Sequence, residues 1–85
     1  NNKYNLIDTQ GKLVSPNQWF DGAGDFYDGY AWVKLNDKFN SIDTQGKLVS
    51  PNQWFDGVGN FSEGYAPVKL SNKWNFIDTK GIFTA

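Results

Sequence analysis

The sequence is dominated by an internal repeat of 35 residues that runs without a gap. Residues 2–36 and 37–71 align along their whole length, and only nine positions differ, so that 26 of 35 are identical. A third copy begins at Asn72 and stops after 14 residues. Repeats of this length are units that bury their apolar faces against neighbouring copies. We therefore predict a single repeat domain over residues 1–85, and we expect the chain to be a fragment of a longer protein.

Each copy contains three short segments with strand character, and no segment has the apolar spacing of an amphipathic helix. In residues 30–35 and 65–70, Ala, Val and Leu alternate with Tyr, Lys and either Trp or Pro, as expected for a half-buried strand. The remaining predicted strands, which bring the total to about eight, are residues 3–8, 12–14, 38–43, 47–49, 73–78 and 82–84.

The connections between these segments predict tight antiparallel turns. Asn36-Asp37 forms a two-residue loop of the composition that type I′ hairpins favour, because both central residues need a positive φ. The Asp-Thr-Gln-Gly sequence at 8–11 predicts a type I turn in which Gly11 takes the left-handed position of a bulge. The three strands of a copy are therefore expected to form an antiparallel meander. Pro67 lacks an N–H, which places its strand at an edge of that meander.

The segment SPNQWFDG, at 15–22 and 50–57, is predicted to form one helical turn. Ser is a good N-cap, Pro a good first residue and Gly a good terminator. This turn would present Trp19 and Trp54 to the core. In contrast, the exchange of Leu6 for Ser41 is hard to accommodate in a shared core, and it predicts exposure in at least one copy.

These elements predict an all-β fold of tandem three-stranded antiparallel meanders. Propeller blades usually have four strands and roughly 40–45 residues per repeat, whereas this unit has three strands in 35 residues. An open β-solenoid or a propeller-like repeat is therefore expected. The alternative is a small rolled or barrel-like sheet.

Composition excludes several classes of function. The chain has no His and no Cys, which removes Ser-His-Asp triads, zinc-thiolate sites and thiol nucleophiles. A net charge of −1 offers no basic surface for nucleic acid or anionic lipid, and no apolar run approaches the length of a membrane span. We expect neither a nucleic-acid nor a membrane partner, no enzyme activity and no cofactor.

The acidic residues suggest no metal or catalytic site. Asp21, Asp25 and Asp28 lie in a glycine-rich loop, but their spacing departs from that of a calcium-binding EF-hand loop. Asp28 and Glu63 occupy equivalent positions in successive copies, so duplication alone explains this pair of carboxylates. We therefore predict turn-forming and solvated acids rather than ligands or general acids.

The sequence NKWNFIDTKG at 72–81, together with GNFSEGYAPVKL at 59–70 and the 35-residue period, resembles the bacterial WG or KWG repeat family. The resemblance covers the whole chain. It implies an all-β repeat protein with no catalytic residues to carry over. One departure is that Asn5, Asn40 and Asn75 stand at the family's glycine position. Asn tolerates a positive φ better than most residues, which would preserve the backbone there.

Aromatic residues are the candidate contact residues. The chain has 4 Trp, 4 Tyr and 7 Phe, and such side chains supply much of the contact area in interfaces. The predicted function is that of a non-catalytic scaffold that binds a protein partner. The alternative is a carbohydrate or cell-wall binding module, and self-association or exchange of a repeat between molecules is a further expectation. The predicted binding residues are Tyr27, Tyr30, Trp32 and Tyr65.

Overall fold

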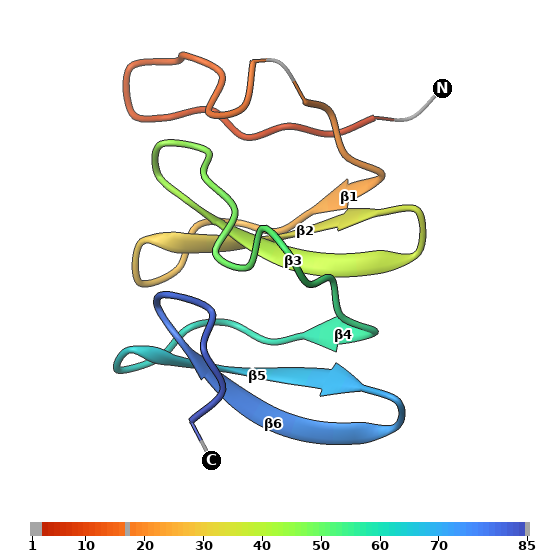
Figure 1. Cartoon of the computed structure of the whole chain (residues 1–85). Coiled ribbons are helices and arrows are strands. Elements are labelled where there is room, and N and C mark those ends of the chain that lie inside the picture. The colour runs from red at the N-terminus through yellow and green to blue at the C-terminus, as the bar shows by residue number, and fades with distance from the viewer. Residues whose placement is uncertain (1–2, 17, 85) are drawn as a thin grey trace.

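The computed structural model describes residues 3–16 and 18–84, and it shows an all-β chain (Figure 1). Two three-stranded antiparallel sheets follow one another along the molecule, with strand orders β1-β2-β3 and β4-β5-β6. The described residues contain no helix. Asn2 and Ala85, the outer ends of the predicted repeats, and Asn17 of the predicted turn lie outside the described residues. The strands are β1 (Gly22–Ala23), β2 (Tyr30–Leu35), β3 (Lys38–Asp43), β4 (Gly57–Val58), β5 (Tyr65–Leu70) and β6 (Lys73–Asp78).

The two long hairpins have the strands and the turns that the sequence predicts. β2 pairs with β3 along its full length, from Tyr30 opposite Asp43 to Leu35 opposite Lys38, and β5 pairs with β6 in the same register. In the turn between β2 and β3, Asn36 has a φ of 54° and Asp37 a φ of 68°. Both central residues are thus left-handed, as a type I′ turn requires.

The prediction of the third strand in each meander is wrong. Residues 12–14, 47–49 and 82–84 make only isolated bridges, such as the one between Ile42 and Leu48, and residues 3–8 form no regular strand either. The sheets are completed instead by β1 and β4, which come from the glycine-rich loops. β2 and β5 are therefore central strands, and the predicted edge position of Pro67 is also wrong.

Pro67 is tolerated in a central strand because of where the short strand β4 ends. The Pro67 carbonyl accepts a hydrogen bond from the Gly59 N–H at 2.8 Å. At the equivalent place in the first copy, the Gly24 N–H donates to the Trp32 carbonyl at 3.0 Å, and the Trp32 N–H makes no return bond to the Gly24 carbonyl. A proline at this position therefore removes no ladder hydrogen bond.

Each hydrophobic core is built from two successive copies. β2 of the first copy pairs with β3 of the second, so a sheet spans the boundary between copies. The alternation of β2 buries Ala31 and Val33, as the sequence predicts. The first core consists of Leu6, Val14, Phe20, Ala31, Val33 and Ile42, and the second of Val49, Phe55, Phe61, Ala66, Val68 and Ile77.

Several predictions about individual side chains need correction. Leu6 and Ser41 are both buried, although the exchange between them predicted exposure. Trp19 is exposed, whereas Trp54 is half-buried and packs against the first core. The predicted helical turn is a single hydrogen-bonded turn, and the hydroxyl of Ser50 is buried without a partner in the described chain instead of capping it.

The asparagine at the family's glycine position holds each copy together by hydrogen bonds rather than by a positive φ. Asn40 is not among the left-handed residues. Its Oδ1 accepts from the Ser41 and Ser50 N–H groups at 2.8 and 3.3 Å. Its Nδ2 donates to the carbonyls of Ser50 and Gln53 at 2.8 and 3.3 Å. All four capacities of the buried amide are thereby satisfied.

Successive copies stack through close contacts at the turn glycines. Gly46 has a φ of +83°, and a Cβ added to it would lie 2.3 Å from the Val14 carbonyl oxygen. Gly81 has the same conformation, and its added Cβ would lie 2.5 Å from the Val49 carbonyl oxygen. Only glycine allows the backbones to approach so closely. The same contact thus recurs one repeat further along the chain.

Candidate binding surface

The four predicted binding residues do not form one site. Tyr27 and Tyr30 face each other across a tight turn, in which each N–H donates to the other's carbonyl at 2.7 and 3.1 Å. Tyr27 is exposed, but the ring of Tyr30 packs on Phe61 of the next copy, with 4.5 Å between the ring centroids. Tyr65 is exposed in the second sheet.

Trp32 is half-buried and lies over the glycine-rich strand beside it. A Cβ added to Gly24 would lie 2.0 Å from the Trp32 Nε1, so the missing side chain makes the room that the indole occupies. Its ring also meets Phe39 at a centroid distance of 5.8 Å. Trp32 therefore has a packing role in the first sheet.

The outward face of the second sheet carries exposed aromatic side chains. Tyr65 belongs to β5, and Trp74 and Phe76 belong to β6, where they lie opposite Lys69 and Pro67. Because side chains alternate along a strand, these residues share one face, and the core residues of β5 and β6 share the other. Their exposed fractions are 51% for Tyr65, 61% for Trp74 and 50% for Phe76. We call these three side chains the aromatic face.

The equivalent face of the first sheet is covered by the second copy. Ser41 stands at the position of Phe76 and is buried. Phe39, at the position of Trp74, is half-buried, and Tyr30, at the position of Tyr65, packs on the next copy. The aromatic face is thus the one that a following unit would cover in the same stack.

Two hollows border the aromatic face. One, of about 550 Å³, combines the rings of Tyr65 and Phe76 with polar groups of Ser62, Glu63 and Thr84. The other, of about 430 Å³, contains Trp74 and is lined by Leu70, Lys73, Trp74, Asn75 and Phe83. The surface therefore offers ring faces for apolar contact and, at one side, hydroxyl and carboxylate groups for hydrogen bonding.

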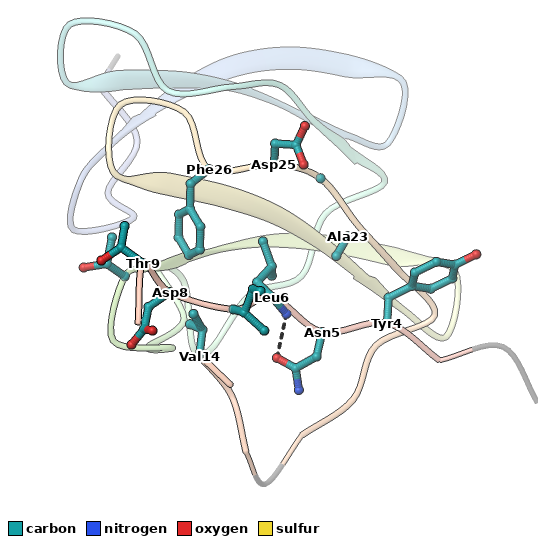
Figure 2. A pocket seen from close by; sticks show the side chains of 12 residues that line it. Tyr4, Asn5, Leu6, Asp8, Thr9, Val14, Ala23, Asp25 and Phe26 are labelled. Carbon is teal, nitrogen blue, oxygen red and sulfur yellow. Dashed lines mark hydrogen bonds between the residues drawn. The ribbon is translucent and has the colours of Figure 1, made fainter. Parts of the chain in front are cut away.

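A larger groove lies at the other end of the molecule, between residues 4–9 and residues 23–26 (Figure 2). Its volume is about 620 Å³. Tyr4, Leu6 and Phe26 line it with apolar groups, and Asp8 and Asp25 add carboxylates. The first part of the chain, which lines this groove, lies in Figure 1 at the opposite end of the molecule from β5 and β6.

One aspartate in each full copy links distant segments of that copy, Asp21 in the first and Asp56 in the second. Asp21 accepts a hydrogen bond from the Lys3 ammonium at 2.6 Å and another from the Asn36 N–H at 2.9 Å. Asp56 is bound in the same way by Lys38 and by the Ser71 N–H. The lysine, followed by the backbone donor, lowers the pKa of each aspartate below its ordinary value.

Other acidic side chains accept hydrogen bonds from backbone N–H groups in or next to the turns. Backbone N–H donors of Lys12 and Gln10 lower the pKa of Asp8, and those of Ile82 and Lys80 lower the pKa of Asp78. The carboxylate of Asp28 accepts the N–H of Glu63 at 3.3 Å, which links the two copies. Within the described residues, no three His, Cys, Asp or Glu side chains are grouped so that they could hold a metal ion.

Trp74 and Phe76 are surface residues that were not among the predicted binding residues. The signal that could have identified Phe76 is its exchange for Ser41 in an otherwise similar strand, which puts a large apolar group where the neighbouring copy has a small polar one.

No helix in the part of the chain described here is long and apolar enough to cross a membrane.

The comparison with protein families agrees with this architecture. The model of the WG containing repeat matches the chain twice, over residues 6–39 and 42–74. These matches cover most of the sequence, and the chain belongs to this family. Among curated proteins and among solved structures, no match is found.

Proposed function

We propose that this member of the WG repeat family is a non-catalytic β-repeat scaffold that binds a protein partner through its aromatic face. The observation that carries the proposal is the exposure of Tyr65, Trp74 and Phe76 side by side on one sheet face. A contiguous apolar patch on a small protein marks an interaction site. Trp and Tyr are also the residues that contribute most to binding energy at interfaces.

We further propose that the units stack as an open solenoid or a propeller-like array. Support comes from the contacts that recur with the period of the sequence. Gly46 approaches the Val14 carbonyl as Gly81 approaches that of Val49. A regular contact of this kind generates a regular stack, because the same displacement relates each unit to the next.

A carbohydrate ligand is the second candidate, and the hollow beside Tyr65 favours it. There the rings of Tyr65 and Phe76 lie next to the polar groups of Ser62, Glu63 and Thr84. Aromatic rings stack on the apolar faces of sugars, and neighbouring polar groups orient the ligand in a concave site. Trp74 lies outside this hollow, so the two ligand classes differ in the residues that they need.

The test is the variant Phe76→Ser. The chain itself supplies the design, because Ser41 occupies the same position in the folded second copy. The variant therefore removes the aromatic ring without an expected loss of fold. Tyr27→Ser is the matched control: it removes an exposed tyrosine elsewhere on the surface, and Ser62 is its natural counterpart. Each protein is screened against a displayed random-peptide library and a glycan array.

For a protein-binding scaffold, peptides are selected by the unaltered chain and by Tyr27→Ser, whereas Phe76→Ser and Trp74→Ala lose them. For a carbohydrate module, the glycan array gives the signal, and Trp74→Ala retains it. If the selected peptides bound Phe76→Ser as tightly as they bind the unaltered chain, the aromatic face would be excluded as the binding surface.

A further inference from the structure

The first segment of the chain has one edge that is hydrogen-bonded and one that is not. On the inner edge, Tyr4 exchanges two backbone hydrogen bonds with Phe20 at 2.7 and 2.9 Å, and the Leu6 carbonyl accepts the Val14 N–H at 2.8 Å. These bonds tie the segment to the rest of its copy. Asn5 and Ile7, which alternate with Tyr4 and Leu6, form the outer edge.

The outer edge presents free backbone groups. Within residues 3–16 and 18–84, no partner engages the backbone N–H or C=O groups of Asn5 and Ile7. Ile7 also has 64% of its surface exposed. A row of unpaired backbone donors and acceptors beside an apolar side chain is a template for adding a strand.

The second copy shows what covers this edge. Asn40 and Ile42 are the counterparts of Asn5 and Ile7, and β2 lies against them with Val33 opposite Asn40 and Ala31 opposite Ile42. Ile42 is completely buried as a result. The carbonyls of Trp32 and Lys34 point to β1 instead, so Ala31 and Val33 are the residues of β2 whose backbone faces β3.

The groove of Figure 2 provides the space for the side chains of such a strand. Tyr30 of β2 packs on Phe61 of the second copy, and the counterpart of Phe61 in the groove is Phe26. Trp32 and Lys34 of β2 both lie by Phe39, Lys34 with its Nζ 5.6 Å from the ring centroid.

Tyr4 is the counterpart of Phe39, and it also lines the groove. Both aromatic contact points of an added strand are therefore present. Asp8 is the counterpart of Asp43, which lies opposite Tyr30, so Asp8 would lie opposite the first aromatic residue of the added strand.

We infer that this edge and groove bind an extended peptide, which adds a strand antiparallel to residues 3–8. The pattern of the peptide is that of β2: two aromatic residues two positions apart, a small or β-branched residue after each, and then Lys. This site lies at the opposite end of the molecule from the aromatic face. The inference can therefore be tested independently of the function proposed for the aromatic face.

The test uses a synthetic peptide with the sequence GYAWVKLN, which is that of residues 29–36, added to the 85-residue chain. Two N-methylated forms serve as matched probes. Methylation at the Ala and Val corresponding to Ala31 and Val33 blocks the donors that face residues 3–8. Methylation at the Trp and Lys corresponding to Trp32 and Lys34 blocks donors that face away. The readouts are affinity and amide hydrogen exchange at Asn5 and Ile7.

We expect saturable binding that slows exchange at Asn5 and Ile7. The inward-methylated peptide should bind about tenfold more weakly or worse, and the outward-methylated peptide within about threefold of the parent. Equal loss with both methylated peptides, or binding without protection of Asn5 and Ile7, would overturn the inference. Protection in the chain alone that increases with its concentration would assign the edge to a second molecule, and would equally overturn a peptide as the occupant.

Discussion

Ile7 and Ile42 begin the same 16-residue sequence, IDTQGKLVSPNQWFDG, yet their environments are opposite. Ile42 is completely buried in the first core, whereas 64% of Ile7 is exposed. The difference lies in the preceding neighbour, because β2 pairs with Ile42 and no described strand pairs with Ile7. The burial of this isoleucine therefore depends on the previous copy and not on the sequence of its own copy.

The turn glycines show the same difference between a copy with a described copy before it and a copy without one. Gly11, Gly46 and Gly81 share a left-handed φ, between 79° and 83°. A Cβ added to Gly46 or Gly81 would collide with the copy before it, but one added to Gly11 would meet nothing within 4 Å. The turn needs a residue that accepts this φ in all three places. Only in two of them does stacking exclude a side chain as well.

The largest expected effect comes from truncating the two isoleucines. Ile42→Ala should lower the free energy of unfolding by about 2–5 kcal/mol, because it leaves a cavity in the first core. Ile7→Ala should cost less than about 1 kcal/mol, since most of the side chain is in water. Urea denaturation of both variants measures the difference. Equal losses would mean that the neighbouring copy does not decide burial.

A smaller difference is expected at the asparagine that closes each copy. Asn40 is buried, and the same four hydrogen bonds are made by Asn5, which is half-exposed. Asn40→Ala should cost about 2–3 kcal/mol, because it leaves buried backbone groups of Ser50 without partners. For Asn5→Ala water can replace the lost partners, and about 1 kcal/mol is expected. Chemical denaturation compares the two, and a larger cost at Asn5 would contradict the role of burial.

The turn glycines separate backbone strain from stacking. Gly11→Ala should cost about 1 kcal/mol for the left-handed conformation alone. Gly46→Ala carries the same strain and also pushes against the Val14 carbonyl, so its cost should be larger by about 1–2 kcal/mol. Thermal unfolding of the two variants gives the comparison. Identical midpoints would show that the copies separate at this contact without cost.

The sequence predicts local structure well because local chemistry decides it. The positive φ values of Asn36, Asp37 and Gly11 follow from loop length and residue type. The alternation of residues 30–35 likewise gives the buried face of β2. The family resemblance was confirmed over two matched segments.

Some of the errors concern contacts between copies, and others concern strand pairing within one copy. Trp19 and Trp54 are identical in sequence context, and only Trp54 packs on a preceding core. The short strands β1 and β4 arise because Gly24 and Gly59 let a central side chain lie over them, which a pattern of apolar residues does not reveal. Leu6 and Ser41 are both buried, although one is apolar and the other polar. At the candidate site, Tyr65 was predicted, but Trp74 and Phe76 required the register of β5 and β6.

The smallest expected effect is a titration in which the two copies should behave alike. Asp21 and Asp56 bind only groups of their own copy: Lys3 and Asn36 in the first, Lys38 and Ser71 in the second. The pKa of each aspartate is lower in the folded chain than its ordinary value. Folding is therefore stabilised above the unfolded pKa of about 3.9, and this contribution is lost as pH falls through the lower folded pKa.

Asp21→Asn and Asp56→Asn should each remove part of that acid dependence and change the unfolding midpoint little at neutral pH, because the pairs are exposed. Circular dichroism between about pH 5 and pH 2 follows the transition, and added salt should reduce the effect of both substitutions equally. If Asp56→Asn were much the more damaging, the preceding copy would influence even contacts that lie within one copy. Equal effects would confine that influence to the packing of Ile42 and the stacking of Gly46.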